Sequence, residues 1–306
     1  MSDIVAASTP AAPAVGRSAA STAARTALFA LGLFAAMVVG GLLAEVLVPS
    51  VGEALAARQQ QAAASIGAVA LVALLQALLL APVAARARPG PWRVALCVGG
   101  AYWLITPLLM QIESAVFLAP LLPDGFLLSV GISESVAAAA AGALAAALFG
   151  RRADDAAGPR HAALLDARVP VHAWGARLIA ICAIYIVLYF LAGAFIAWRN
   201  PELQAFYDQI GTPSLGIVLG VQVPRGMLWA AAGALLLGVL DTNRRTGALL
   251  VALVFALPVT LLILPNPIMP PEVRSTHFVE VAASNILFGL ATAWILTRRR
   301  RGSEGG

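Results

Sequence analysis

The sequence contains no lysine, only two cysteines and three histidines, and few charged residues of either sign. Charged residues make up 11% of the chain, whereas soluble domains usually carry about 25%. Hydrophobic residues make up 60%, and the mean hydropathy is +0.87. A soluble core cannot bury this much apolar surface, so the composition excludes an ordinary soluble domain and indicates that lipid is the main solvent.

Several function classes are excluded by what is missing. The formal net charge of +5 does not indicate nucleic-acid binding, because the arginines stand in loops beside apolar runs. Cys97 and Cys182 each lie inside an apolar run without CxxC spacing, which argues against a disulfide or a metal role. The chain also has no GxSxG elbow, no Walker A loop and no HExxH motif.

The apolar runs are long and rich in alanine and leucine, which favours helices over the short alternating strands of a membrane barrel. Runs of about 20 residues are needed to span the hydrocarbon layer. The sequence therefore predicts an all-α membrane protein, a polytopic bundle of about eight transmembrane helices in one domain over residues 26–298. The predicted helices are Thr26–Val48, Ala64–Val83, Trp92–Met110, Val130–Phe149, Ala176–Trp198, Ile217–Leu240, Thr246–Leu264 and Phe278–Thr297.

The remaining segments are polar or broken by proline. Residues 1–25 are rich in Ala, Ser, Thr and Pro and are expected to form a disordered cytoplasmic tail. Residues 151–175 are expected to form a cytoplasmic linker, and residues 299–306 a basic cytoplasmic tail. Residues 111–129 and 201–216 fit no full span, and each is interpreted either as a re-entrant or interface-lying piece or as an ordinary ordered loop.

The arginines predict the orientation of the chain. On the eight-helix topology, sixteen of the 20 arginines fall on the side of the two termini, and Arg58, Arg199, Arg225 and Arg274 fall on the other. Cytoplasmic loops carry an excess of basic residues. We therefore expect a multi-pass protein of the cell membrane, of the bacterial inner-membrane type, with both termini in the cytoplasm.

The two halves of the domain, residues 26–150 and 176–298, end in similar sequences. Residues 138–152 and 285–299 align without gaps and place Gly142 opposite Gly289. Because each half has an even number of helices, a duplication would produce parallel repeats. The alternative is chance, since alanine-rich segments align easily.

The stretch from residue 264 to residue 285 is the richest in polar side chains. Its prolines predict a rigid outer loop, and Ser275 or Thr276 is expected to cap the eighth helix. His277 and Glu280 then share one helix face, with Asn285 two turns deeper. This spacing allows a divalent metal cofactor held by His277 and Glu280, a polar site without metal, or a histidine beside lipid headgroups with a carboxylate at the helix dipole.

Two further positions are candidates because charge inside a span is costly. Gln111 and Glu113 follow the third predicted helix in apolar surroundings. Arg225, flanked by Pro224 and Gly226, lies inside the sixth. A structural Arg–Glu pair between helices and the binding of an anion both explain such an arginine, because its guanidinium contacts either partner in the same way.

The predicted topology places these ionisable groups on the outer side of the membrane. They are Glu45, Glu113, Glu134, Arg225, Arg274, His277 and Glu280. An outward-facing polar site is the resulting hypothesis. We expect it to bind or transport a small or lipidic anionic ligand, with Arg225 on the anion and glutamates relaying protons. The alternatives are an accessory or sensor subunit that binds a membrane-protein partner, and a membrane-embedded enzyme that acts at the outer leaflet through His277, Glu280 and Glu113.

Overall fold

The computed structural model describes residues 19–62, 66–150, 161–165, 169–266 and 268–298. Eight helices in these ranges are long and apolar enough to cross a membrane. The prediction of an all-α polytopic bundle is therefore confirmed. Most of the predicted terminal tails (residues 1–18 and 299–306) and much of the predicted linker (residues 151–160 and 166–168) lie outside the described residues.

The eight spans are formed by single helices or by helices joined end to end. They are α1 (Ala19–Leu47), α3 (Ile66–Ala85), α4 (Pro91–Trp103) continued by η1 (Leu104–Leu109) and α5 (Met110–Phe117), α6 (Phe126–Phe149), α7 (Val171–Phe195) followed by η4 (Ala197–Arg199), α9 (Leu215–Val239), α10 (Arg244–Phe255) continued by α11 (Leu257–Leu261), and α12 (Pro271–Leu296). A short 3-10 turn, η2 (Ala119–Leu121), precedes α6.

The third span is longer than the sequence predicts. Pro107 lacks an N–H group and lies in η1, a π-helical stretch that lets the helix continue past the proline. The helix then runs on through α5 to Phe117. The interpretation of residues 111–129 as a separate re-entrant piece or a loop is therefore wrong for its first part, and Gln111 and Glu113 belong to the last turns of a spanning helix.

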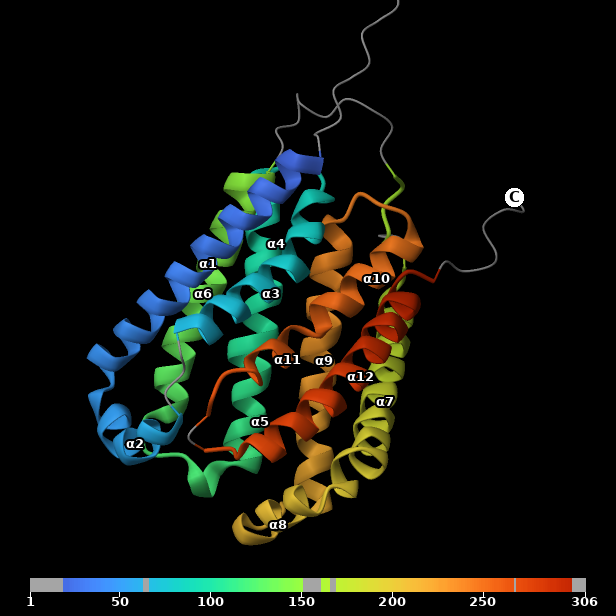
Figure 1. The fold of residues 1–306 in the computed structure, drawn as a ribbon. Coiled ribbons are helices and arrows are strands. Elements are labelled where there is room, and N and C mark those ends of the chain that lie inside the picture. The colour runs from blue at the N-terminus through green and yellow to red at the C-terminus, as the bar shows by residue number, and fades with distance from the viewer. Residues whose placement is uncertain (1–18, 63–65, 151–160, 166–168, 267, 299–306) are drawn as a thin grey trace, which may run out of the picture.

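Two short helices lie outside the spans, α2 (Pro49–Ala62) and α8 (Pro201–Ile210). Both lie at the same end of the bundle, which we call the far end (Figure 1). The side chain of Asn200 caps α8 by accepting hydrogen bonds from the backbone N–H groups of Glu202 and Leu203. Residues 201–216 therefore begin with a separate helix, whereas α2 was not predicted.

The eighth span starts earlier than expected. α12 begins at Pro271, a residue that suits the first helical position because its missing N–H group would be unpaired there anyway. Ser275 and Thr276 lie inside the helix, where both hydroxyls donate to the carbonyl of Glu272. The prediction that one of them caps the helix is wrong.

The two halves have the same order of elements and the same neighbours. In each half a first span, a short far-end helix and three more spans follow one another. The first span packs on the second and the fourth, and the third packs on the fourth. Between halves, α4 packs on α9 and α10 packs on α3, so each third span contacts the second span of the other half. α1 and α7 lie on opposite flanks (Figure 1). A parallel repeat related by a twofold axis along the bundle requires this pattern.

The aligned glycines occupy equivalent contacts. A Cβ atom at Gly142 would lie 2.6 Å from the carbonyl oxygen of Ala95 on α4, and one at Gly289 would lie 2.6 Å from the Cα of Ala252 on α10. In both halves the fourth span thus approaches the third backbone to backbone, as small residues allow in membrane helices.

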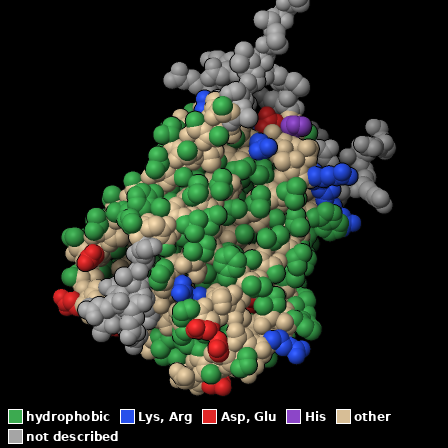
Figure 2. Space-filling model, viewed as in Figure 1, with side chains coloured by type: hydrophobic (Ala, Val, Ile, Leu, Met, Phe, Trp, Pro, Cys, Tyr) green, Lys and Arg blue, Asp and Glu red, His purple; other side chains and the backbone are tan. Residues whose placement is uncertain are grey.

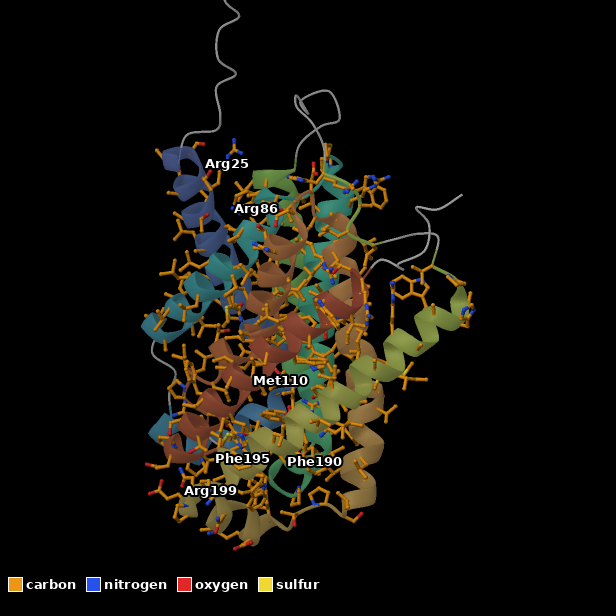
Figure 3. All side chains as sticks on the ribbon, turned by 90° about the vertical axis from the view of Figure 1, so that its right-hand side faces the viewer. Arg25, Arg86, Met110, Phe190, Phe195 and Arg199 are labelled. Atoms are coloured by element: carbon orange, nitrogen blue, oxygen red, sulfur yellow. The ribbon has the colours of Figure 1, made fainter. Side chains whose placement is uncertain are left out.

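Arginines lie at both ends of the bundle. Arg25 and Arg86 lie at one end and Arg199 lies at the other (Figure 3). At the arginine-rich end, Arg88 donates to the carbonyl of Leu240 and Arg177 to that of Leu296, so the guanidinium groups also cover helix carboxyl ends. The visible surface between the two ends is largely hydrophobic (Figure 2).

Candidate functional site

Arg225 is the charged residue on which the candidate site is built. It lies ten residues into α9, about 15 Å from the start of that helix at 1.5 Å per residue. Its side chain is 6% exposed. The Nη2 group donates to Glu113 Oε2 at 2.6 Å, and the Nη1 group donates to Gln222 Oε1 at 3.0 Å. The predicted structural Arg–Glu pair therefore exists, and α5 and α9 provide its two members.

Two buried donors beside this pair have no partner among the described residues. They are the Nε group of Arg225 and the Nε2 group of Gln222. Because Gln222 Oε1 accepts from Arg225, the amide nitrogen must point elsewhere. The two residues are three apart on α9 and share a face. A buried donor left unpaired costs about 1–3 kcal/mol, so this face is rich in hydrogen-bond donors that an acceptor would satisfy.

A second group joins α8 to α12. His277 Nδ1 lies 2.7 Å from Glu280 Oε2, and His277 Nε2 lies 3.2 Å from the hydroxyl of Tyr207. The side chains of His277 and Glu280 are 18% and 12% exposed. At the residue before His277, Thr276 Oγ1 accepts a hydrogen bond from Asn200 Nδ2 at 2.6 Å. The histidine therefore bridges a carboxylate and a phenol, an arrangement that holds its ring in one orientation.

Tyrosines connect the arginine pair with the histidine group. Burial, together with the charges of Glu113 and Glu280, raises the pKa of Tyr207 well above its usual value. Tyr185 and Tyr189 of α7 are within electrostatic reach of Glu113, Arg225 and Glu280, and the Arg225 guanidinium lies 5.6 Å from the Tyr185 ring centroid. We call this group the far-end cluster; it comprises Glu113, Tyr185, Tyr189, Tyr207, Gln222, Arg225, His277 and Glu280.

An aromatic layer lies on the arginine-rich side of the far-end cluster. Trp229 follows Arg225 by one turn, and its ring centroid is 4.5 Å from that of Phe255 and 6.2 Å from that of Phe288. All three rings are buried. Tyr185 also packs on Phe288, at 5.0 Å between centroids. The polar cluster is thus closed off toward the arginine-rich end by apolar rings.

Three predicted candidates bind backbone carbonyls instead. Gln111 donates to Leu127 O at 2.7 Å and ties α5 to α6. Asn285 donates to Phe255 O, which has lost its helical donor because Val259 N–H bonds to Ala256 at the break between α10 and α11. Arg274 donates to the carbonyls of Leu262 and Leu264 at the end of α11. These side chains stabilise helix ends and breaks.

Two predicted glutamates lie outside the far-end cluster. Glu45 is exposed near the end of α1. Glu134 of α6 faces Tyr102 of α4, with 3.4 Å between its Oε2 atom and the tyrosine hydroxyl. The structure thus brings together Glu113, Arg225, His277 and Glu280 but not these two.

Among the described residues, no third metal-ligating side chain joins the predicted pair of His277 and Glu280. Within the described ranges, no group of three or more His, Cys, Asp or Glu side chains could hold a metal ion. His277 and Glu280 remain a pair whose members contact each other. Catalytic zinc sites use three protein ligands and structural ones use four. We therefore assign no step to a metal at this pair.

Sequence reasoning missed the uncharged members of the cluster. Gln222 lies one turn before Arg225 on α9, and this spacing could have identified a polar face on that helix. Tyr207 lies on the short helix of residues 201–210, and nothing in the sequence indicates that this helix turns back onto α12. The contact depends on the loop geometry after α7.

No family model, no curated protein and no solved structure matches this chain. What the fold and the spans define is the class of protein: a multi-pass, all-α membrane protein with eight spans in two similarly packed halves.

Proposed function

We propose that the chain binds and transports an anionic ligand that carries a carboxylate or phosphate group, with Arg225 as the anion-binding residue. The observation that carries this proposal is the buried guanidinium with a free Nε group next to the free Nε2 group of Gln222. An oxyanion that accepts from both groups would remove two unpaired donors at once. Arginine is suited to this role because its fork matches carboxylate and phosphate geometry.

Binding of an anion at Arg225 depends on the contact between Glu113 and the guanidinium. Glu113 contacts the guanidinium through Nη2 alone, and its own side chain is 34% exposed. The Nε group has no partner among the described residues and is available to a second oxyanion. Such a ligand brings another negative charge to the pair, so its binding weakens the hold of Glu113 on Arg225. This exchange of carboxylates gives the two states that alternating access needs.

The orientation of the site follows from arginine distribution. The far-end cluster lies opposite the arginine-rich end, and the positive-inside tendency assigns the latter to the cytoplasm. On this assignment both termini are cytoplasmic and the cluster receives its ligand from outside, from the aqueous phase or from the outer leaflet. A bacterial inner membrane is the setting we propose.

Binding is tested by ligand-dependent thermal unfolding of the purified full chain in a mild detergent. The probes are inorganic phosphate, acetate, succinate and phosphatidylglycerol, each compared with chloride at equal ionic strength. A ligand that binds the folded chain at 100 times its Kd stabilises it by about 2.7 kcal/mol. We expect at least one probe to raise the Tm of the wild type and to have no effect on Arg225→Gln.

Arg199→Gln is the matched control. Arg199 is exposed at the same end of the bundle, so the variant removes the same charge without touching the cluster. It should keep the full response. Equal responses of the wild type and Arg225→Gln to every probe would contradict the proposal. Flux of the responding anion in proteoliposomes then separates transport from binding, and a flux that Arg225→Gln leaves unchanged also counts against it.

A second candidate is a membrane-embedded enzyme that acts on lipid at the outer leaflet. The hydrogen-bonded side chains Tyr207, His277 and Glu280 favour it, because a carboxylate that orients a histidine supports general acid–base chemistry. The test compares lipid extracts of cells that express the wild type or His277→Gln by mass spectrometry. A lipid product that depends on His277 would place this candidate first, and identical extracts would exclude it.

A further inference from the structure

Glu134 is a carboxyl group inside the first half that the anion site does not use. It lies eight residues into α6, about 12 Å along the helix at 1.5 Å per residue. The ion pairs of the described residues are Arg225–Glu113 and His277–Glu280, so no basic side chain there balances Glu134. A carboxylate without a partner is expensive at such a depth and escapes the cost by taking up a cation.

The donor and the acceptor of each hydrogen bond near Glu134 can be assigned from the neighbouring contacts. The hydroxyl of Thr260 donates to Leu257 O at 2.7 Å, so its oxygen is free to accept from Gln76 Nε2 at 3.1 Å. The oxygen of the Gln76 amide therefore faces Tyr102, whose hydroxyl donates to it at 2.8 Å.

The single hydrogen of the Tyr102 hydroxyl is thus already used. The contact of 3.4 Å between this hydroxyl and Glu134 Oε2 needs a hydrogen from the other side, which is the carboxyl group. Thr106, the other side chain that interacts with Glu134, gives its own hydrogen to the carbonyl of Tyr102. Both neighbours of Glu134 are therefore acceptors in this network, as a protonated carboxyl group requires.

Comparison of the two halves shows which basic side chains of the second half have no counterpart beside Glu134. Gln76 and Gln222 lie on the second spans of the two halves, and Glu134 and Glu280 lie on the fourth spans, one residue out of the register that pairs Gly142 with Gly289. That register places Leu78 opposite Arg225 and Val130 opposite His277. The first half thus keeps the glutamine and the glutamate but lacks both basic partners.

We propose that Glu134, with Tyr102 and Gln76, forms a proton-binding site in the first half of the chain, paired with the anion site in the second. One proton from solvent forms an O–H bond on the carboxyl group and removes one negative charge from the span. The O–H group donates to the Tyr102 oxygen. When the proton leaves, the Tyr102 hydroxyl rotates from Gln76 to the carboxylate and Gln76 turns its amide, so the Gln76–Tyr102 pair exists in two orientations.

The surroundings of Glu134 bring no other charge to it. The elements packed on α6 are α1, α2, α3, α4 with η1, and α5, and the carboxylate of α2, Glu53, is exposed. α3 has no ionisable residue, and the described ionisable residues of α1, Arg25 and Glu45, lie near its two ends. On the third span, Arg93 lies at the start and Glu113 near the end, where it is bonded to Arg225. Tyr102 is thus the titratable group that faces Glu134.

The test is infrared spectroscopy of the purified full chain at neutral pH. We expect the C=O stretch of a protonated carboxylic acid in the wild type and its loss in Glu134→Gln. In Tyr102→Phe the band should persist and move to higher frequency, because the acceptor of its hydrogen bond is gone. Glu45→Gln, which removes an exposed carboxylate near the same end, should leave the band unchanged. Identical spectra of the wild type and Glu134→Gln in this region would overturn the proposal.

A chemical probe gives an independent reading in the folded wild type. Dicyclohexylcarbodiimide enters the lipid phase, where a protonated carboxyl group adds across one of its C=N bonds, and mass spectrometry locates the resulting N-acylurea adduct. We expect labelling of Glu134 and none of Glu113. Labelling of Glu113 in preference to Glu134 would contradict the assignment.

The role of this site in transport rests on the proposed function, whereas proton binding does not. In proteoliposomes, Glu134→Gln should lose the response of anion flux to a pH gradient while the Tm response to the anion persists. If the anion probes fail but the carboxylic-acid band is present, the transport proposal falls and the proton site stands. A full response to the gradient in Glu134→Gln would overturn the coupling.

Discussion

For single side chains, the Arg225–Glu113 pair gives the sharpest test of stability. Glu113→Gln leaves a buried guanidinium without its charged hydrogen-bond acceptor, which we expect to lower the free energy of unfolding by about 1–3 kcal/mol. Arg225→Gln should cost less, because the Glu113 side chain is 34% exposed and lipid headgroups or water screen it.

The double variant Arg225→Gln/Glu113→Gln should be closer to wild type than the sum of the single changes predicts. Thermal unfolding of all four proteins in the same detergent gives the coupling energy of the cycle. A coupling near zero would mean that the two charges do not depend on each other.

Tyr207 makes a separate prediction about alkaline pH. Its pKa is raised by burial and by the charges of Glu113 and Glu280. The neutral phenol therefore contributes stability that is fully present below the ordinary tyrosine pKa of about 10 and is lost as pH rises above it. The loss can reach about 1.4 kcal/mol per pH unit.

Tyr207→Phe removes this titration together with the contact to His277. The difference in unfolding free energy between wild type and variant should thus be constant up to about pH 10 and shrink above it. The measurement is denaturation over that pH range. A difference that stays constant throughout would show that Tyr207 does not titrate with unfolding.

For helices, the close approaches at Gly142 and Gly289 test whether both halves pack in the same way. Gly142→Ala and Gly289→Ala each place a methyl group 2.6 Å from backbone atoms of the neighbouring third span. We expect each to cost about 1–3 kcal/mol through overpacking.

Gly41→Ala and Gly220→Ala provide the matched controls, because a methyl group at either position meets no atom within 4 Å. These changes should be neutral or stabilising by up to about 1 kcal/mol, since alanine favours helix over glycine. Thermal unfolding compares the four variants. Equal effects at packed and open positions would argue against backbone contact at the glycines.

The number and placement of the spans could be predicted from the sequence, because each needs only a long apolar run. Three features could not. The continuation through Pro107 depends on a π-helical adjustment, and the start at Pro271 on a proline that reads equally well as loop. α2 has a mixed composition and is held by contacts of Val51 and Leu55 with residues of α6, which lie far along the chain.

The candidate site, like the fold, could be predicted from the sequence only in part. Arg225, Glu113, His277 and Glu280 could be predicted because charge in an apolar run is conspicuous, and the predicted sharing of one end placed them together. Glu134 and Glu45 were predicted on the same side of the membrane for the same reason. Residues that share a side of the membrane need not lie close to one another. Which helix faces turn toward each other is decided by packing, so the separation of Glu134 from the far-end cluster needed the structure.

Across the two halves, one scaffold carries two different charge patterns. The buried Gln76 and Gln222 lie on second spans, and Glu134 and Glu280 lie on fourth spans, yet only the second half has arginine and histidine beside them. If the two halves move as separate bodies, a change of charge in one half acts on the other through the contacts of α4 with α9 and of α3 with α10. A proton in the first half would remove unbalanced charge from its span, whereas an anion in the second would add a negative charge beside the Arg225–Glu113 pair and compete with Glu113 for the guanidinium.

The proposed binding of an anion from outside the cell requires the far end of the bundle to face outward. Cysteine labelling can decide this orientation. Gln209 is exposed on α8 at the far end, and Arg245 is exposed at the start of α10. The two native cysteines are inside spans, so the wild type should not react with a membrane-impermeant maleimide. In intact spheroplasts we expect Gln209→Cys to be labelled and Arg245→Cys to be labelled only after lysis. The opposite pattern would place the far-end cluster in the cytoplasm, and the anion would then have to enter from inside the cell.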